Sequence, residues 1–416
     1  MQYTTDKGSG LMTAGRVNIG ATSINGVAQE FEVETGSISA NDFIQFAEED
    51  IGVISSGSFT GETDLTLIDA CYLDSERQLV VYRAGTNIKA FVWHIGVAYT
   101  KGVTYIIASD AYYLTNLKAV TVGTDKVAII FNNASGVRCY IITINSRSIT
   151  THGGNTLNNA TMLDAAYVST DTLLITEKTS SSTQITKCSI STYTVSVNST
   201  TVISNVLATK AITKRYDSNA YISIIKASTG VYVSMFKYSS NTLIKMHEAR
   251  LVDTSEIIDI ALETYGDNKA VVLYNVDTIT YMLDLRLSDV AVIVRSLPVH
   301  DVKINNISCV NVKDNIFDIF YKRDTGAGYG CKSRLHLTDN AVFASETVMF
   351  ENAVSSTRIL VMPSGKYTLV VSGDLRVFGK AYTPNIKVRK APSYNKINGI
   401  AKSSGSTGEI IRVVSI

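Results

Sequence analysis

The 416-residue chain is 45% hydrophobic and so is long enough to bury a large core, and length alone would suggest about two or three domains. Its charged residues are few (18%), scattered and nearly balanced at a net charge of +1, which excludes broad electrostatic attraction to nucleic acid or to an anionic membrane. The sequence has no apolar run long enough to span a bilayer and no basic start followed by an apolar segment. We therefore expect no membrane insertion and no secretion signal.

The first 48 residues predict a small β-rich extension. Arg16–Ile19 and Phe31–Val33 are short strand candidates around the glycine-bearing stretch Gly20–Gly26, and Asn41–Asp50 is predicted as one or two helical turns. A segment of this size is too small to hold a core of its own.

Residues 49–381 carry the strongest pattern, which is an internal repeat. Short apolar runs are separated by 48, 46, 48, 50, 46 and 50 residues, and they begin at Leu79, Val127, Leu173, Tyr221, Val271, Phe317 and Tyr367. This spacing fits one four-stranded sheet per repeat. It predicts an all-β, seven-bladed β-propeller, with rings of six or eight as alternatives.

Each repeat shows the same gradient of hydrophobicity. In the first copy a weak strand, Leu67–Tyr72, precedes the apolar run at Leu79, which is followed by an alternating strand, Ile88–Ile95, and a more polar segment, Val103–Ala108. The gradient is typical of a propeller, because the second strand is buried on both faces by neighbouring sheets. We expect Ile51–Phe59 to supply the outer strand of the last sheet and so close the ring without open edges.

Residues 382–416 predict a hairpin-like extension. Lys387–Lys390 is a strand candidate, and Ile397–Ile416 has the pattern of a strand, a Ser/Gly turn and a final strand.

No sequence motif predicts catalysis or a cofactor. The five histidines are scattered, the single tryptophan, Trp93, excludes repeated sialidase-type boxes, and WD and kelch signatures are missing. The glycine-rich stretch Asp324–Gly330 joins two strands without a following helix, so a hairpin loop is favoured over a phosphate site. The five cysteines are odd in number and widely spaced, which predicts buried thiols and no disulfide framework.

Three aspartates recur at a spacing of 95 residues, which is two repeats. Asp69, Asp164 and Asp259 occupy equivalent places in the predicted inner strands. Together they would offer a hard cation its preferred oxygen ligands in the central channel. The favoured interpretation is that each carboxylate accepts hydrogen bonds from a neighbouring sheet or loop.

Tyrosines in loops and at strand ends are the candidate partner-binding residues, because an amphipathic ring can stack on a sugar or anchor a protein interface. They are Tyr112, Tyr113, Tyr193, Tyr216, Tyr265 and Tyr329.

The C-terminal G-I-A-x-S-S-G-S-x-G-E turn followed by a V-V strand resembles terminal β-elements of tailed-bacteriophage virion proteins, and residues 15–38 have a similar character. The resemblance implies a non-enzymatic protein of a virion tail, baseplate or fibre, oligomeric in its assembly and made in the host cytoplasm. Other virion proteins would bind the terminal extensions, and a host-surface glycan or protein would bind the propeller. A lectin-like propeller is the alternative function, and a glycan-cleaving enzyme is the least favoured.

Overall fold

A computed structural model describes residues 29–33, 36–48, 53–58, 65–94, 100–109, 114–169, 171–239, 242–300, 303–313, 315–323, 330–337, 342–350, 357–361, 366–371, 374–380, 386–390, 399–401, 403–406 and 410–415. These residues form strands and turns, and none of them lies in a helix. No helix in this part of the chain is long and apolar enough to cross a membrane.

The chain divides into two compact units. One comprises Met1–Asp50, His336–Ser345 and Pro384–Ile416, and the other comprises Ile51–Leu335 and Glu346–Thr383. We call them the terminal unit and the propeller unit.

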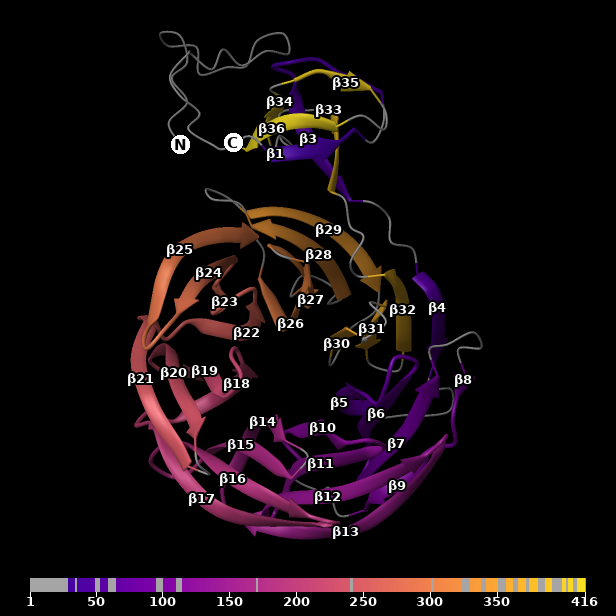
Figure 1. The fold of residues 1–416 in the computed structure, drawn as a ribbon, viewed down its shortest axis with the longest axis vertical. Helices are drawn as coiled ribbons and strands as arrows, with labels where there is room; N and C mark the ends of the chain where they lie inside the picture. Colours follow the sequence, from indigo (N-terminus) through magenta and orange to yellow (C-terminus); the bar gives the residue numbers. More distant parts are fainter. Residues whose placement is uncertain are drawn as a thin grey trace. The chain divides into compact units, whose positions relative to one another are not determined.

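The terminal unit combines both ends of the chain in one sheet, where indigo N-terminal strands pair with yellow C-terminal strands in Figure 1. The order is β1 (Gln29–Glu32), β36 (Ile410–Ser415), β34 (Gly399–Ala401), β3 (Phe43–Glu48) and β33 (Ile386–Lys390). A second, two-stranded sheet pairs β2 (Ser37–Ile38) with β35 (Gly405–Ser406). The strands predicted at Phe31–Val33, Lys387–Lys390 and the C-terminus are therefore confirmed, and the two predicted extensions pair with each other.

The helical prediction for Asn41–Asp50 was wrong. Phe43–Glu48 is a strand, β3, that pairs antiparallel with β33 and β34. The turn before it is held by the same partner segment, because the Asn41 N–H donates to the Ala401 carbonyl (2.7 Å) and the Ala401 N–H donates to the Asp42 carbonyl (2.9 Å). Pairing partners at least 338 residues away (Glu48 with Ile386) decide the conformation here. The predicted strand at Arg16–Ile19 lies outside the described residues.

The propeller unit is built from antiparallel sheets whose strands are consecutive in the chain (Figure 1). The first is β5 (Leu65–Tyr72), β6 (Arg77–Ala84) and β7 (Asn87–His94), with β8 (Thr100–Lys101) and β9 (Tyr105–Ala108) both paired to β7. Four-stranded sheets follow with these strands: β10 (Leu117–Gly123), β11 (Lys126–Asn133), β12 (Gly136–Asn145), β13 (Ser148–Asn158); β14 (Thr161–Ser169), β15 (Thr172–Lys178), β16 (Thr183–Ser191), β17 (Thr194–Ser204); β18 (Ala208–Arg215), β19 (Ala220–Ala227), β20 (Gly230–Ser239), β21 (Thr242–Val252).

The remaining sheets continue the series to the point of closure. Their strands are β22 (Ile257–Tyr265), β23 (Lys269–Val276), β24 (Ile279–Leu287), β25 (Ala291–His300); β26 (Ile304–Lys313), β27 (Ile316–Arg323), β28 (Gly330–Leu337), β29 (Val342–Phe350); β30 (Thr357–Val361), β31 (Lys366–Val371), β32 (Asp374–Lys380), β4 (Val53–Ser58). We name each sheet by its first strand in sequence, the last one being the β30 sheet.

The first strands of neighbouring sheets contact one another in a closed cycle from β5 through β30 and back to β5. Strand β4 pairs with β32, from Ser58 opposite Asp374 to Val53 opposite Phe378, so the predicted closing role of Ile51–Phe59 is confirmed. This arrangement confirms the all-β propeller fold. The blade number of seven stays a prediction, since stretches of the first and last sheets lie outside the described residues.

The core follows the predicted hydrophobicity gradient. In β11 and β23 every residue except the terminal ones is buried. Side chains of neighbouring sheets share clusters, as where Leu79 and Val81 pack with Val127 and Ile129. Full burial of such a side chain stabilises the fold by about 1.5–3 kcal/mol.

Bulges recur at one place in the outer strands. The register of β13, β17, β21 and β25 shifts by one residue near the middle of each strand. The extra residues are Gly153, Asn198, Met246 and Val294. A bulge bends a strand, and these four outer strands contact each other in series around the rim.

Candidate functional site: the turn face of the propeller

The three recurring aspartates are buried, with at most 7% of each residue exposed. Each follows a register shift in its first strand, between Thr66 and Ile68, between Met162 and Asp164, and between Ile257 and Asp259. Such a bulge re-aims the side chain that follows it. The carboxylates therefore reach the next sheet, while Asp259 Oδ1 also accepts from the N–H of Ile260 in its own strand (2.9 Å).

Each carboxylate accepts a backbone hydrogen bond from the first strand of the next sheet. Oδ2 of Asp69 accepts from the N–H of Ala119 (2.9 Å), Oδ2 of Asp164 from Thr213 (2.6 Å), and Oδ2 of Asp259 from Ile307 (2.9 Å). The hydrogen-bonding interpretation of the three aspartates is confirmed.

Lysines from the preceding sheet complete two of these contacts. Nζ of Lys118 lies 2.8 Å from Oδ1 of Asp164, and Nζ of Lys210 lies 2.5 Å from Oδ1 of Asp259. Both carboxylates thus join three successive sheets. No group of three or more metal-ligating side chains that could hold an ion occurs among the residues that were placed.

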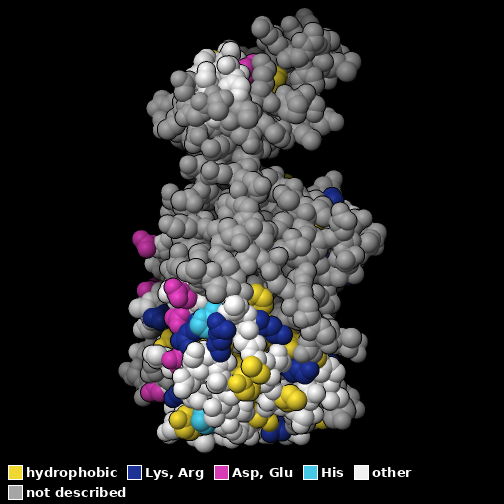
Figure 2. All heavy atoms as spheres, turned by 90° about the vertical axis from the view of Figure 1, so that its right-hand side faces the viewer, with side chains coloured by type: hydrophobic (Ala, Val, Ile, Leu, Met, Phe, Trp, Pro, Cys, Tyr) yellow, Lys and Arg dark blue, Asp and Glu magenta, His cyan; other side chains and the backbone are white. Residues whose placement is uncertain are grey.

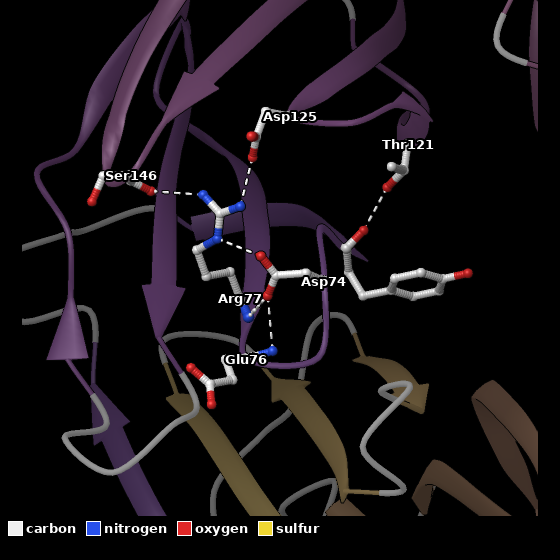
Figure 3. A network of polar contacts seen from close by, with 7 residues as sticks. Asp74, Glu76, Arg77, Thr121, Asp125 and Ser146 are labelled. Carbon is white, nitrogen blue, oxygen red and sulfur yellow. Dashed lines mark hydrogen bonds and ion pairs between the residues drawn. The ribbon is translucent and has the colours of Figure 1, made fainter.

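In a sheet of consecutive antiparallel strands, the turn from the first to the second strand and the turn from the third to the fourth strand lie at the same end. We call this end of the propeller unit the turn face. A second set of contacts joins neighbouring sheets there. Arg77 is at the centre of this set of contacts (Figure 3). Its Nε lies 2.6 Å from Asp74 Oδ2, Nη2 lies 2.6 Å from Asp125 Oδ1, and Nη1 donates to the Ser146 carbonyl (3.2 Å). One guanidinium therefore fixes a turn of the β5 sheet to two turns of the β10 sheet.

The charge on this network is stabilised by hydrogen bonds. Burial alone would raise the pKa of Asp74, but the backbone N–H of Glu76 and the Arg77 side chain and N–H outweigh burial and lower it. For Arg77, burial opposes the charge and the two aspartates raise the pKa above its usual range. Both groups stay ionised at neutral pH.

Tyr193 is the predicted binding residue that the structure places at the turn face. It lies in the β16–β17 turn and is 42% exposed. Its ring stacks on His152 of β13, with centroids 3.7 Å apart and planes 4° apart, and Lys126 Nζ lies 5.7 Å from its centroid. His152 Nε2 is in turn 2.7 Å from Thr143 Oγ1. The exposed ring is thus held by groups of the adjacent sheet.

Of the other predicted tyrosines, Tyr265 and Tyr216 lie in the described part of the chain, and both are less exposed than Tyr193. Tyr265 ends β22 (Ile257–Tyr265) as predicted, but its ring is buried and its hydroxyl donates to Asp284 Oδ1 at 2.5 Å. Tyr216 is half-buried and packs on a hydrophobic cluster. Tyr112, Tyr113 and Tyr329 lie outside the described residues.

Two further tyrosines at the turn face escaped prediction. Tyr72 (45% exposed) and Tyr167 (39% exposed) lie near the ends of β5 and β14. The carbonyl of Tyr72 accepts from Thr121 Oγ1 (2.6 Å), and that of Tyr167 accepts from the Tyr221 hydroxyl (3.3 Å). Their backbone is fixed to the next sheet while the rings are exposed. The signal was present, because each follows a recurring aspartate by three residues.

Glu177 and most of the cysteine thiols are buried within the sheets. Glu177 is fully buried, with hydrogen bonds from Asn158 Nδ2 (2.8 Å) and Thr186 Oγ1 (2.5 Å). All five cysteines are free and all but the half-buried Cys309 are buried. Burial raises the pKa of Cys188 to about 12, with a smaller contribution from the charge of Glu177. These groups fill structural positions in the sheets.

Comparison with protein-family models and with curated proteins finds no match. Among solved structures, the chain is similar to the Dos1 propeller, with a TM-score of 0.49 and 10% sequence identity over 78% of this chain and 94% of that one.

Proposed function

We propose that the protein is a non-enzymatic binding module whose propeller presents its turn face to a partner. The observation that supports this most is the set of three tyrosines, Tyr72, Tyr167 and Tyr193, each about two-fifths exposed at the same end of the sheets. Their anchor points are hydrogen-bonded or stacked across sheet boundaries. A partner that contacts them pays little ordering entropy, and tyrosine is favoured at interface hot spots.

The assembly that we propose for this module is a bacteriophage virion, as part of a tail, baseplate or fibre. The resemblance of the terminal segments to virion proteins is the support for this proposal. In it, the terminal unit contacts other virion proteins, and the turn face contacts a virion protein or the host surface. Mass spectrometry of phage particles from a lysate of cells carrying the gene tests the assignment, and particles without the chain would contradict it.

The triple variant Tyr72→Ala/Tyr167→Ala/Tyr193→Ala tests the turn face itself. We expect its melting temperature to stay within a few degrees of the parent, because the rings are exposed, while its attachment to particles or host cells weakens about tenfold or more. Val202→Ala on β17, which removes an equally exposed aliphatic side chain (45%), is the matched control. Equal attachment by the triple variant and the control would refute the turn-face proposal.

A lectin-like function is the second candidate, and the Tyr193–His152 stack favours it. A flat, exposed ring beside a lysine is suited to the apolar face and hydroxyls of a sugar. Binding of the parent chain to a defined glycan on an array, lost on Tyr193→Ala, would establish this function over a protein partner.

A further inference from the structure

The fourth strand of the β5 sheet is broken, unlike those of the four sheets that follow. Outer strands β13, β17, β21 and β25 each run for 10 or 11 residues. In the β5 sheet two short pieces replace such a strand, β8 with two residues and β9 with four, and Gly102–Thr104 belong to neither. The single segment predicted at Val103–Ala108 is therefore a strand only from Tyr105.

The break is held in place by close packing at Gly102. Its N–H donates to the Val92 carbonyl at 2.8 Å, and a Cβ at this position would lie 3.0 Å from that oxygen and 3.4 Å from the Cβ of Arg147. Arg147 belongs to the β12–β13 turn of the next sheet. The interrupted strand thus brings Gly102 beside Arg147.

The break exposes two aliphatic side chains to solvent. Val103 is 67% exposed and Ile106 is 59% exposed, the highest values among large hydrophobic residues in the described part of the chain. Exposed aliphatic side chains rimmed by polar ones mark an interaction site.

Cationic side chains lie on the same sheet and on the adjoining turn. Lys89 is opposite Ile106 in the β7–β9 ladder, and Lys101 lies over the Phe91 ring with Nζ 4.8 Å from its centroid. Arg147 is exposed and makes no ion pair with any described residue. Figure 2 shows lysine, arginine and hydrophobic side chains interspersed on this side of the propeller unit.

The neighbouring histidine does not add to this charge. Burial lowers the pKa of His94, and the positive charges of Arg147 and Arg77 lower it further. The positive charge beside Val103 and Ile106 is therefore due to lysine and arginine.

We propose that the rim patch, defined as Lys89, Lys101, Val103, Ile106 and Arg147, binds an extended acidic segment of a partner protein in which carboxylate and aliphatic side chains alternate. The carboxylates would pair with the cations, and the aliphatic side chains would cover Val103 and Ile106. Backbone groups at Val103 and Thr104, outside the strand ladder, are suited to an added peptide strand. The patch adjoins the turn face, because Arg147 lies in the β12–β13 turn, but the binding proposed here does not depend on the three turn-face tyrosines.

The probe for the test is a fluorescein-labelled peptide of about ten residues that alternates glutamate and valine, with a lysine–valine peptide as its counterpart. Fluorescence anisotropy with the full chain should show binding of the glutamate peptide alone, weakening as salt rises because the contacts are solvent-exposed ion pairs. Arg147→Glu should weaken binding about tenfold or more.

Arg286→Glu is the matched control, since Arg286 is an exposed arginine on β24 without an ion pair to a described residue. Its affinity should stay within about twofold of the parent chain. The proposal is overturned if the parent chain does not bind the glutamate peptide, or if Arg147→Glu and Arg286→Glu bind it equally. Arg147-dependent binding to phosphatidylserine vesicles without peptide binding would also overturn it and assign the patch to a lipid surface.

Discussion

The carboxylate of Asp164 in the β14 sheet accepts the backbone N–H of Thr213 in the β18 sheet at 2.6 Å, and both residues are buried. The same carboxylate pairs with Lys118 of the β10 sheet. A single side chain thus satisfies a backbone donor that would otherwise be buried without a partner, which is more costly than the net value of an ordinary hydrogen bond.

Replacing this carboxylate should therefore destabilise the ring. We expect Asp164→Ala to lower the free energy of unfolding by about 3 kcal/mol, because it leaves the Thr213 N–H and the Lys118 ammonium without their acceptor. Asp164→Asn, which keeps an acceptor oxygen, should cost less. Urea denaturation measures both, with Asp267→Ala in an exposed turn as control. A change of the same size in the control would rule out a special role for Asp164.

Removing divalent metal ions should not affect stability. The oxygens of Asp164 and Asp259 are engaged by N–H and ammonium groups of neighbouring sheets. A chelator should leave the melting temperature unchanged, since only a ligand bound to the folded state stabilises it by mass action. A reproducible fall on adding chelator, reversed by calcium or magnesium, would instead support the cation site.

Gly230 should tolerate no side chain. Its φ is +145°, and an added Cβ would lie 2.0 Å from the Val252 carbonyl oxygen. Gly230→Ala must therefore strain the backbone and displace the end of β21, at an expected cost of about 3 kcal/mol. Gly85→Ala is the control, because Gly85 also has positive φ (+59°) but has no atom within 4 Å of its Cβ position. Gly85→Ala should lower the free energy of unfolding by about 1 kcal/mol. If both variants lower it equally, the structure relieves the clash at Gly230.

Alkaline pH should weaken the fold through its buried thiols. Burial raises the pKa of Cys188 from 9.0 to about 12, so above pH 9 the unfolded chain loses the proton while the folded chain keeps it. The stabilisation is complete below pH 9 and is lost as pH rises toward 12, by about 1.4 kcal/mol between pH 8 and pH 10 for this residue. Urea titrations at the two pH values should show a smaller difference for Cys188→Ala than for the parent chain. The same slope in both would assign the loss to other groups.

Two truncated chains, one with β4 and one without it, should differ in stability and in association if β4 closes the ring. A fragment of residues 46–384 keeps β4, whereas residues 60–384 lack it and leave β32 unpaired. We expect the longer fragment to be monomeric and to melt cooperatively, and the shorter one to melt lower and associate through the open edge. Size-exclusion chromatography with thermal melting compares them. Identical behaviour would mean that β4 contributes nothing to closure.

The sequence predicted those strands whose burial follows from the composition of a single repeat. Strand β23 is apolar along its whole length and has neighbours on both faces, so composition alone indicates its place. Strand β4 was found by a different argument, since the last sheet otherwise lacked an outer strand. Both predictions rest on rules that do not require knowledge of distant partners.

Features that depend on distant partners were not predictable in this way. Strand β3 exists because residues 386–401 pair with it, and a local reading of Asn41–Asp50 favours a helix. Tyr265 resembles the loop tyrosines in sequence, but its hydroxyl is bound by Asp284 of the same sheet and its ring packs on Phe317 of the β26 sheet. The lysine partners of the aspartates were equally invisible, because their spacing of 46 and 49 residues has no local meaning.

The β30 sheet combines strands from both ends of the propeller unit, and this affects the order in which its strands are synthesised. Its outer strand, β4, leaves the ribosome before any other part of the propeller, but β32, to which it pairs, ends at Lys380 and is among the last. Throughout translation of the intervening sheets, β4 has no partner in its own chain. Nascent chains on neighbouring ribosomes could exchange this strand, so slow elongation late in the message would increase the fraction of intertwined products.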